Sequence, residues 1–310
     1  MIRTARFRTL AFAPSTALSA GALDKAGSAL AIAMLAAVIG VWMAEQSNVD
    51  AQAKAARGTT GPTVGEAAGG QTMVAGYFGA PYTYASDIRF LNPATNTDFT
   101  LVHAGWDAKP FKSPIYYGLR IARWGTWNRT GMMVDFTHAK TITRPDEEVE
   151  IRGLINGAPA PAKAKIGAMF KHLEFSHGHN MLTLNGLLRL ASLTPRLSPY
   201  VGAGAGISLP HTEVQMTDED KRTYEYQYAG PVAQALAGLE LRLGSTSLFF
   251  EYKFSFAAQS APLSHLETGN LFSDVWRQYR NWASGTPPPG GHISTRLSSH
   301  HVIGGVAYRF

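Results

Sequence analysis

The sequence predicts an all-β protein, an eight-stranded antiparallel transmembrane β-barrel with four long extracellular loops. Apolar residues recur at every second position in eight separate segments, which is the period of a strand whose two faces differ. The connections between these segments alternate between short and long. Charged residues make up only 16% of the chain, whereas 31 glycines and 11% aromatic residues are typical of closely packed strands.

The first part of the chain resembles a targeting segment. Basic residues precede the apolar run 28–44, and Ala51-Gln52-Ala53 has the A-x-A pattern of a cleavage site. We therefore expect 1–53 to be a signal peptide, with a retained membrane anchor as the competing interpretation. Residues 54–70 are rich in glycine and alanine and are expected to be a flexible lead-in, so that the barrel comprises 71–310.

Period-two alternation predicts the position of each strand. The eight strands are expected at about 71–84, 114–124, 130–142, 172–191, 198–213, 222–243, 246–258 and 295–310. The clearest is 246–258, where Phe250 and Tyr252 alternate with Glu251 and Lys253. A transmembrane barrel places the apolar set outside, whereas a soluble lipocalin-like barrel places it inside.

Two features favour the membrane version. The chain ends on Phe310, which resembles the aromatic end signature that the barrel-assembly machinery of the outer membrane binds. Tyrosine and tryptophan also recur near the predicted strand ends, where aromatic girdles lie. We therefore expect the protein to lie in the cell outer membrane of a Gram-negative bacterium.

The lengths of the connections predict which end of the barrel faces outward. The short connections are 125–129, 192–196 and 244–245, and the long ones are about 85–113, 143–171, 214–221 and 259–294. Short turns at the periplasmic end and long extracellular loops are typical of outer-membrane barrels. Within the last loop, 265–283 has apolar residues at helical spacing with Arg277 and Arg280 opposite them. It predicts an amphipathic helix that either rests on the outer leaflet or covers the barrel mouth.

A barrel of eight strands is filled by its own side chains, which argues against a porin. The charged residues of the inward faces must then pair with one another, because an unpaired buried charge is costly. The expected interior network comprises Arg120, Asp135, Arg189, Glu240, Arg242, Glu251 and Lys253.

Several chemistries find no support in the sequence. The chain has no cysteine, which excludes thiolate catalysis and zinc–thiolate sites. It has no dinucleotide-binding or phosphate-binding loop, and a net charge of +6 does not indicate nucleic-acid binding. Histidine and carboxylate residues do gather at the predicted outer strand ends, where they can bind a divalent metal or transfer protons. Hydrated surface residues are the alternative interpretation of each.

The ordered motifs GWDAKPFKSPIYYGLR, DFTHAK, LEFSHGHNMLTLN, SPYVGAGAGISLPHTEV and RTYEYQYAGP resemble the lipid A oxidase family of outer-membrane barrels. The resemblance covers about 99–258 and the last strand. It implies a protein that oxidises the proximal glucosamine of lipid A to 2-aminogluconate. It also implies molecular oxygen as the oxidant, release of peroxide and dependence on a divalent metal.

On that basis a site can be predicted from the residues that match the motifs. We expect His138 and His211 to bind the metal, Glu174, Glu225 and Tyr224 to act in catalysis, and Asp107, Lys109, Arg120, Arg222 and Tyr226 to bind the substrate. The expected partners are lipid A or lipopolysaccharide and the outer membrane, with no nucleic acid. One alternative is a non-enzymatic structural or surface-interaction barrel. Another is a lipid A deacylase or acyltransferase, for which Ser176 beside His177 is a weak nucleophile candidate.

Overall fold

The computed structural model describes residues 70–125, 128–263, 270–288 and 290–310. The predicted signal peptide 1–53 lies outside the described residues, as does all of the predicted lead-in except Gly70. Among the helices that are described, none is both long and apolar enough to cross a membrane.

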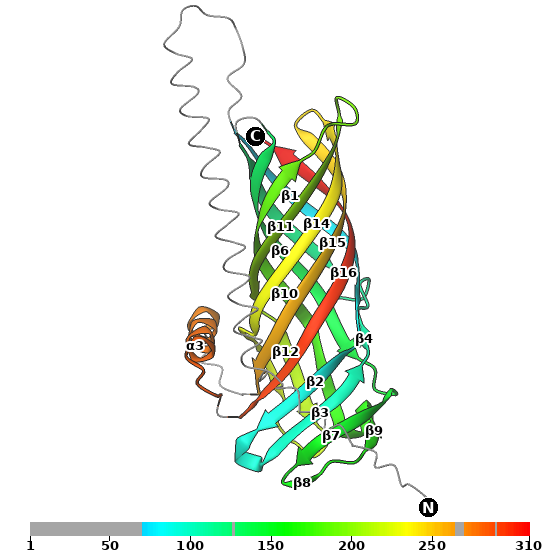
Figure 1. Cartoon of the computed structure of the whole chain (residues 1–310), viewed down its shortest axis with the longest axis vertical. Coiled ribbons are helices and arrows are strands. Elements are labelled where there is room, and N and C mark those ends of the chain that lie inside the picture. The colour runs from blue at the N-terminus through cyan, green and yellow to red at the C-terminus, as the bar shows by residue number, and fades with distance from the viewer. Residues whose placement is uncertain (1–69, 126–127, 264–269, 289) are drawn as a thin grey trace, which may run out of the picture.

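Long tilted strands form the main body of the molecule (Figure 1). They are β1 (Gln71–Thr83), β5 (Tyr117–Trp124), β6 (Thr130–Thr143), β10 (Phe170–Arg189), β11 (Leu197–Ser208), β14 (Gly230–Leu243), β15 (Thr246–Pro262) and β16 (His292–Arg309). Each pairs antiparallel with the next, and β16 pairs back with β1, so that the sheet closes into a ring. The predicted strand segments therefore lie next to one another in the predicted order.

The two faces of the ring differ sharply in polarity. On β15, Glu251 and Lys253 point inward and are fully buried, whereas Phe250 and Tyr252 point outward and are 58% and 44% exposed. The other ring strands repeat this arrangement, with outward Leu119 and Val306 among the exposed apolar residues. An apolar outside and a polar inside are the reverse of a lipocalin, so the outer face of the ring is a surface that contacts lipid.

The inward charges pair as predicted. Arg120 donates two hydrogen bonds to Glu251 at 2.8 and 3.0 Å and one to Asp135 at 3.1 Å. Lys253 Nζ lies 2.5 Å from Asp135 Oδ2. Two cations thus face two carboxylates, and the buried group is electrically balanced, which is the condition for burying charge at all.

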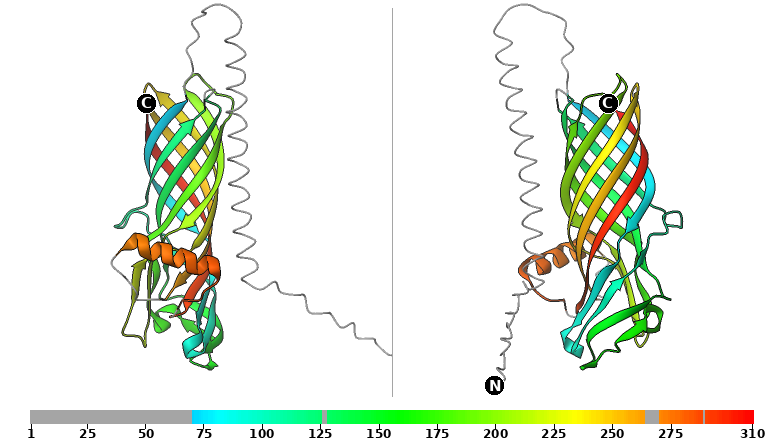
Figure 2. Two further views of the ribbon diagram at one scale, coloured as in Figure 1. Left: turned by 90° about the vertical axis from the view of Figure 1, so that its left-hand side faces the viewer. Right: turned by 45° about the vertical axis from the view of Figure 1, so that its right-hand side comes forward.

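Two of the predicted long loops contain strands instead of irregular chain. The elements are β2 (Ser86–Asn92), η1 (Pro93–Thr95), β3 (Thr97–Ala104), β4 (Trp106–Asp107), β7 (Glu148–Ile155), β8 (Ala158–Pro159), β9 (Lys163–Lys165) and α2 (Ile166–Met169). The sheet continues from the end of β16 through β2, β3 and β7, beyond the ring (Figures 1 and 2). We call this part, together with the β12–β13 hairpin described below, the extension.

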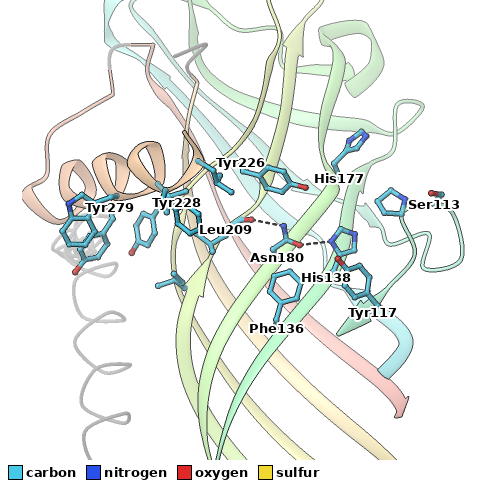
Figure 3. Close-up of a pocket in the computed structure, with 16 residues that line it drawn as sticks. Ser113, Tyr117, Phe136, His138, His177, Asn180, Leu209, Tyr226, Tyr228 and Tyr279 are labelled. Carbon is cyan, nitrogen blue, oxygen red and sulfur yellow. Dashed lines mark hydrogen bonds between the residues drawn. The ribbon is translucent and has the colours of Figure 1, made fainter. Parts of the chain in front are cut away.

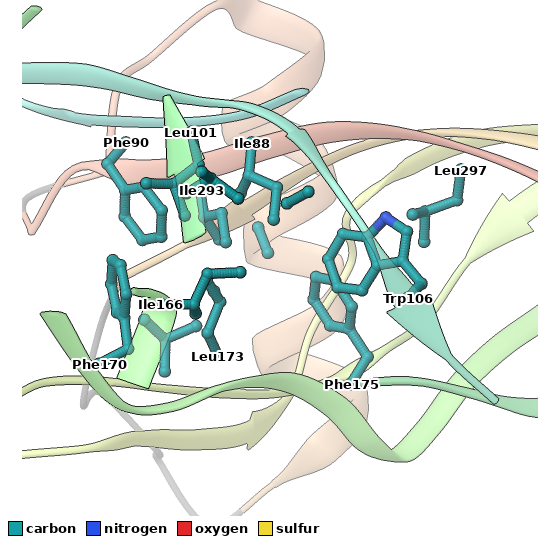
Figure 4. Close-up of a cluster of buried hydrophobic side chains, with 14 of the residues drawn as sticks. Ile88, Phe90, Leu101, Trp106, Ile166, Phe170, Leu173, Phe175, Ile293 and Leu297 are labelled. Atoms are coloured by element: carbon teal, nitrogen blue, oxygen red, sulfur yellow. The ribbon is translucent and has the colours of Figure 1, made fainter. Parts of the chain in front are cut away.

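The extension has its own apolar core (Figure 4). Phe90 of β2 stacks on Phe99 of β3 and on Phe170 of β10, with ring centroids 4.9 and 4.8 Å apart. Ile88 and Leu101 complete the same layer and are fully buried. A folded unit of this kind fixes the outer ends of the ring strands, because β10 and β16 run through both parts.

Two predicted strands are each interrupted at the junction between ring and extension. Segment 198–213 divides into β11 and β12 (His211–Met216), and segment 222–243 divides into β13 (Thr223–Tyr226) and β14. Pro210 lies at the first break, where a residue without a backbone N–H cannot continue the ladder. Among the described residues, the short β12–β13 hairpin therefore pairs only with β10, as part of the extension.

The helix predicted within 265–283 is α3 (Leu271–Ser284). The Asn270 side chain caps its first turn, and Gly285 ends it in the left-handed conformation. The helix lies outside the ring, across its wall (Figures 1 and 2), and not over the mouth. Phe272 and Trp276 remain 85% and 60% exposed, as expected of an interfacial helix. The part of the prediction that covers 265–269 lies outside the described residues.

Candidate functional site

The candidate site lies on the outer wall of the ring, next to the extension (Figure 3). His138 of β6 follows Val134 and Phe136 on the outward face, and Asn180 of β10 lies directly opposite it. His138 Nδ1 and Asn180 Oδ1 are 2.8 Å apart, and Asn180 Nδ2 donates to the Leu209 carbonyl at 3.1 Å. The Tyr117 ring stacks on the imidazole at 4.9 Å. The buried Nε2 atom of His138 has no hydrogen-bond partner among the described residues.

A large pocket separates this wall from α3. Its volume is about 1210 Å³, and Phe136, Leu209 and Tyr226 line it on the wall side. Phe272 and Trp276 line it on the helix side. The walls are thus mostly apolar and aromatic, and the polar groups of His138, His177 and Asn180 also line it.

Tyr228 binds α3 to the outer wall of the ring. Its backbone N–H donates to Gln278 Oε1 at 2.8 Å. Its ring lies edge-on to Tyr279 and Trp282, with centroids 5.3 and 5.4 Å apart. Burial raises the pKa of the Tyr228 hydroxyl, so this ring remains neutral. These contacts hold the helix at a fixed place beside the pocket.

His211 opens β12 within an aromatic cluster. Its ring lies edge-on to Tyr224 at 4.4 Å and to Tyr226 at 4.7 Å, and 5.1 Å from His177. The Tyr224 hydroxyl and His177 Nε2 are 3.2 Å apart. Burial lowers the pKa of His211, and the neighbouring His177 lowers it further. His211 is therefore neutral at physiological pH and can accept a proton.

Acidic and basic side chains meet on the outward face of the extension. Glu213 Oε1 lies 2.8 Å from Arg222 and 3.2 Å from His172 Nδ1, and Glu213 Oε2 lies 3.5 Å from His177. Glu174 Oε1 lies 3.5 Å from the same nitrogen of His172. His172, Glu174 and Glu213 thus offer three metal-binding atoms within 4.8 Å of one another.

The structure distributes the predicted site residues over several places. His211, Tyr224 and Tyr226 lie together, while Glu174 and Arg222 both belong to the group around Glu213. His138 contributes to the pocket, which His211 does not line. Asp107 of β4 pairs with Arg144 at 2.7 Å, and Lys109 is exposed in the connection that follows.

Two predicted site residues lie away from this face. Arg120 is inside the ring, bound to Glu251 and Asp135. Glu225 points to the inner side of the β12–β13 hairpin, where Gln227 donates to it at 2.7 Å. Alternation explains its position, because Tyr224 and Tyr226 on either side both point outward.

His172 and Glu213 were not predicted as site residues. The alternation of side chains along the strands could have found them, because both point to the same side as Glu174. Using that signal requires the position of the bulge near Phe170 and the pairing of β10 with β12. Register between strands distant in sequence cannot be read from either strand alone.

No protein-family model matches the chain, and no curated protein matches it. Solved structures that it resembles include Neisserial surface protein A, with 12% identity, a TM-score of 0.34, and coverage of 78% of this chain and 99% of that one. Another is Ail, the attachment invasion locus protein of Yersinia pestis, in complex with the heparin analogue sucrose octasulfate. Its identity is 13% and its TM-score 0.32, over 78% and 99% of the two chains. A third is the outer membrane protease OmpT from Escherichia coli, with 8% identity and a TM-score of 0.36, over 80% and 99%. All three TM-scores are low, so the fold rests on the strand pairing described above.

Proposed function

We propose that this chain is an outer-membrane barrel of eight strands that binds lipid A at its outer wall and oxidises the proximal glucosamine to 2-aminogluconate. The observation that carries the proposal is the pocket between α3 and the wall. It combines an apolar lining with His138, His177 and Asn180, and it lies on the lipid-facing side of the ring.

The position of the pocket supports a lipid as the ligand. On the side toward the ring, the outward strand face carries exposed apolar residues such as Leu119 and Val134. On the side toward the extension, the pocket is flanked by charged residues such as Arg222 and Glu213. A pocket between these two zones is at the level where the acyl chains of a membrane lipid meet its head group.

The charges near the site suit an anionic head group. Lys109 and Arg222 provide cations at the same end of the molecule, and Arg222 lies 4.3 Å above the Tyr224 ring. Tyr226 is 44% exposed and can lie against a sugar ring or an acyl chain. Lipid A joins anionic groups, sugar hydroxyls and acyl chains in one molecule. These parts match the cationic side chains, the exposed tyrosine and the apolar pocket, in that order.

The proposed reaction removes two electrons from C1 of the free reducing-end sugar. The C1–H and O–H bonds break, a C1 carbonyl forms as a lactone, and molecular oxygen takes up two electrons and two protons as hydrogen peroxide. Water then opens the lactone to the acid, so that the product has gained one oxygen. Neutral His211 is the candidate acceptor of the hydroxyl proton, and Tyr224 positions His177 beside it.

The donor set on this face fits a divalent cation, because one imidazole and two carboxylates suit hard or borderline ions. His172, Glu174 and Glu213 would hold it, and when bound it would polarise a substrate oxygen as a Lewis acid. The earlier assignment of His138 and His211 as ligands stays a prediction. Glu225 and Arg120 have no role in the proposed reaction, because they face away from this side.

Mass spectrometry of lipid A tests this function. Cells lacking the gene would receive the wild type, His138→Ala, His211→Ala or the exposed control His103→Ala, and would be grown with and without oxygen. We expect a gain of one oxygen for the wild type and for His103→Ala, only with oxygen, and a strong loss of that product for the other two. An unchanged product in both His138→Ala and His211→Ala would contradict the proposal.

A non-enzymatic surface barrel is the second candidate. One observation favours it: the polar groups of the site already bind one another, His138 to Asn180 and Glu213 to Arg222. Lipid A that is identical with and without the gene would support this alternative.

A further inference from the structure

We propose that His172, Glu174 and Glu213 form a divalent-cation site on the outward face of the extension. The ion belongs to the class of Mn²⁺, Fe²⁺ and Zn²⁺. This inference does not require that the chain oxidises lipid A, since the three side chains are brought together by the strand pairing itself.

Two of the three distances between the donor atoms match those of a coordination shell, and all three atoms lie within 4.8 Å of one another. His172 Nδ1 lies 3.2 Å from Glu213 Oε1 and 3.5 Å from Glu174 Oε1. Two ligands at about 2.1 Å from one ion are about 3.0 Å apart at a right angle and about 3.4 Å apart at a tetrahedral angle. The two distances from His172 Nδ1 are therefore compatible with ligands of one ion.

The strand register gives an independent reason for a cation. Glu174 of β10 lies directly opposite Glu213 of β12 in the antiparallel ladder. Like charges at directly opposed positions destabilise a sheet unless a positive charge lies between them. A divalent ion neutralises both carboxylates at once.

The neighbours of Glu213 fit this role. The Glu213 side chain is only 5% exposed, whereas the Arg222 side chain that pairs with it is 38% exposed and can turn toward solvent. His211 lies two residues before Glu213 on the same face of β12, and its buried Nδ1 atom makes no hydrogen bond among the described residues. The face thus carries a nearly buried carboxylate and a further histidine, and both residue types are ligands of divalent first-row metals.

The donor types restrict which ion binds. One imidazole with two carboxylates suits Mn²⁺, Fe²⁺ or Zn²⁺, whereas Cu⁺ prefers sulfur ligands. Ca²⁺ takes six to eight oxygens, and the three residues offer carboxylate oxygens from two side chains only.

Manganese binding to the purified protein tests the site directly. The full chain, folded in detergent and stripped with EDTA, would be titrated with Mn²⁺ while electron paramagnetic resonance measures the free ion. The variants are Glu174→Gln and Glu213→Gln, with His103→Ala and Glu150→Gln as controls, because His103 and Glu150 are exposed residues of β3 and β7. Heat-modifiable migration in gels shows whether each variant is folded.

We expect one tightly bound Mn²⁺ per chain that Zn²⁺ displaces, and affinity that falls more than about tenfold in each glutamine variant. The two control variants should bind as the wild type does. If folded Glu174→Gln and Glu213→Gln bind Mn²⁺ as the wild type does, or the wild type binds none, the cluster is an ion-pair network only and the proposal is wrong. Because the readout is binding, failure of the lipid A experiment leaves this result unaffected.

Discussion

The buried charge group inside the ring makes a quantitative prediction about stability. Glu251→Gln removes one negative charge from a group in which Arg120 and Lys253 balance Glu251 and Asp135. The side chains of Arg120 and Glu251 are 2% and 0% exposed, so solvent screening does not weaken the effect. Breaking such a pair on one side leaves an uncompensated buried charge.

The magnitude follows from the contacts. Arg120 makes two charge-assisted hydrogen bonds to Glu251, at 2.8 and 3.0 Å, and loss of one partner of a buried pair costs about 3–5 kcal/mol. Glutamine keeps one acceptor for the Tyr200 hydroxyl, which donates to Glu251 at 2.8 Å. We therefore expect the free energy of unfolding to fall by about 3 kcal/mol, which is the lower end of that range.

The control is an exposed arginine–glutamate pair. Arg152 and Glu150 of β7 lie 2.6 Å apart on the surface, and Glu150→Gln should leave stability unchanged. The double variant Arg120→Met/Glu251→Gln restores electrical balance and should be more stable than Glu251→Gln alone.

The assay is urea-dependent folding into lipid vesicles, followed by tryptophan fluorescence and by heat-modifiable gel migration. A loss below about 1 kcal/mol for Glu251→Gln would refute the reasoning, because a buried pair costs several times more when broken. A double variant at least as unstable as the single one would also refute it.

Three further predictions concern other parts of the fold. Gly118→Val would bring a side chain onto the Tyr77 ring, since even a Cβ would lie 1.8 Å from it. We expect the free energy of unfolding to fall by about 1–3 kcal/mol in the same vesicle assay, and wild-type stability would contradict this. Burial lowers the pKa of His211, so the stability that neutral His211 contributes is complete above about pH 6.5 and is lost as the pH falls through the lowered pKa. Histidine hydrogen exchange followed by mass spectrometry should give a titration midpoint for His211 below pH 6.5. A higher midpoint would argue against burial. Phe90→Ala removes an aromatic side chain stacked between two others and should destabilise the extension by about 3–5 kcal/mol. We expect faster proteolysis of the extension, with unchanged heat-modifiable migration of the closed strand ring. Unchanged proteolysis would show that the extension has no core of its own.

The ring strands were predictable from sequence because each carries its own pattern. Phe250, Glu251, Tyr252 and Lys253 alternate without interruption, and the period of two fixes which side chains share a face. The helix α3 was predictable for the same reason, since its apolar residues follow the helical period. Patterns within one element require no knowledge of its partners.

The extension was not predicted, although its strands show the same signal. Ile88 and Phe90 alternate with Arg89, but the runs are short and lie between ring strands, where long loops are the common case in outer-membrane barrels. The site was only partly predicted, because the neighbours of Glu213 depend on a bulge in β10 and on the hairpin that follows Pro210. Such irregularities shift which residues face one another and leave little trace in the sequence.

The central claim is that a lipid of the outer leaflet occupies the pocket beside α3. Site-specific photo-crosslinking in living cells tests it most directly, with benzoylphenylalanine placed at Tyr226 in the pocket or at Tyr308 near the other end of the ring. Both side chains point outward, and they are 44% and 54% exposed. The account predicts lipopolysaccharide adducts from position 226 and none from position 308. Equal adducts from both positions, or none from position 226, would contradict it.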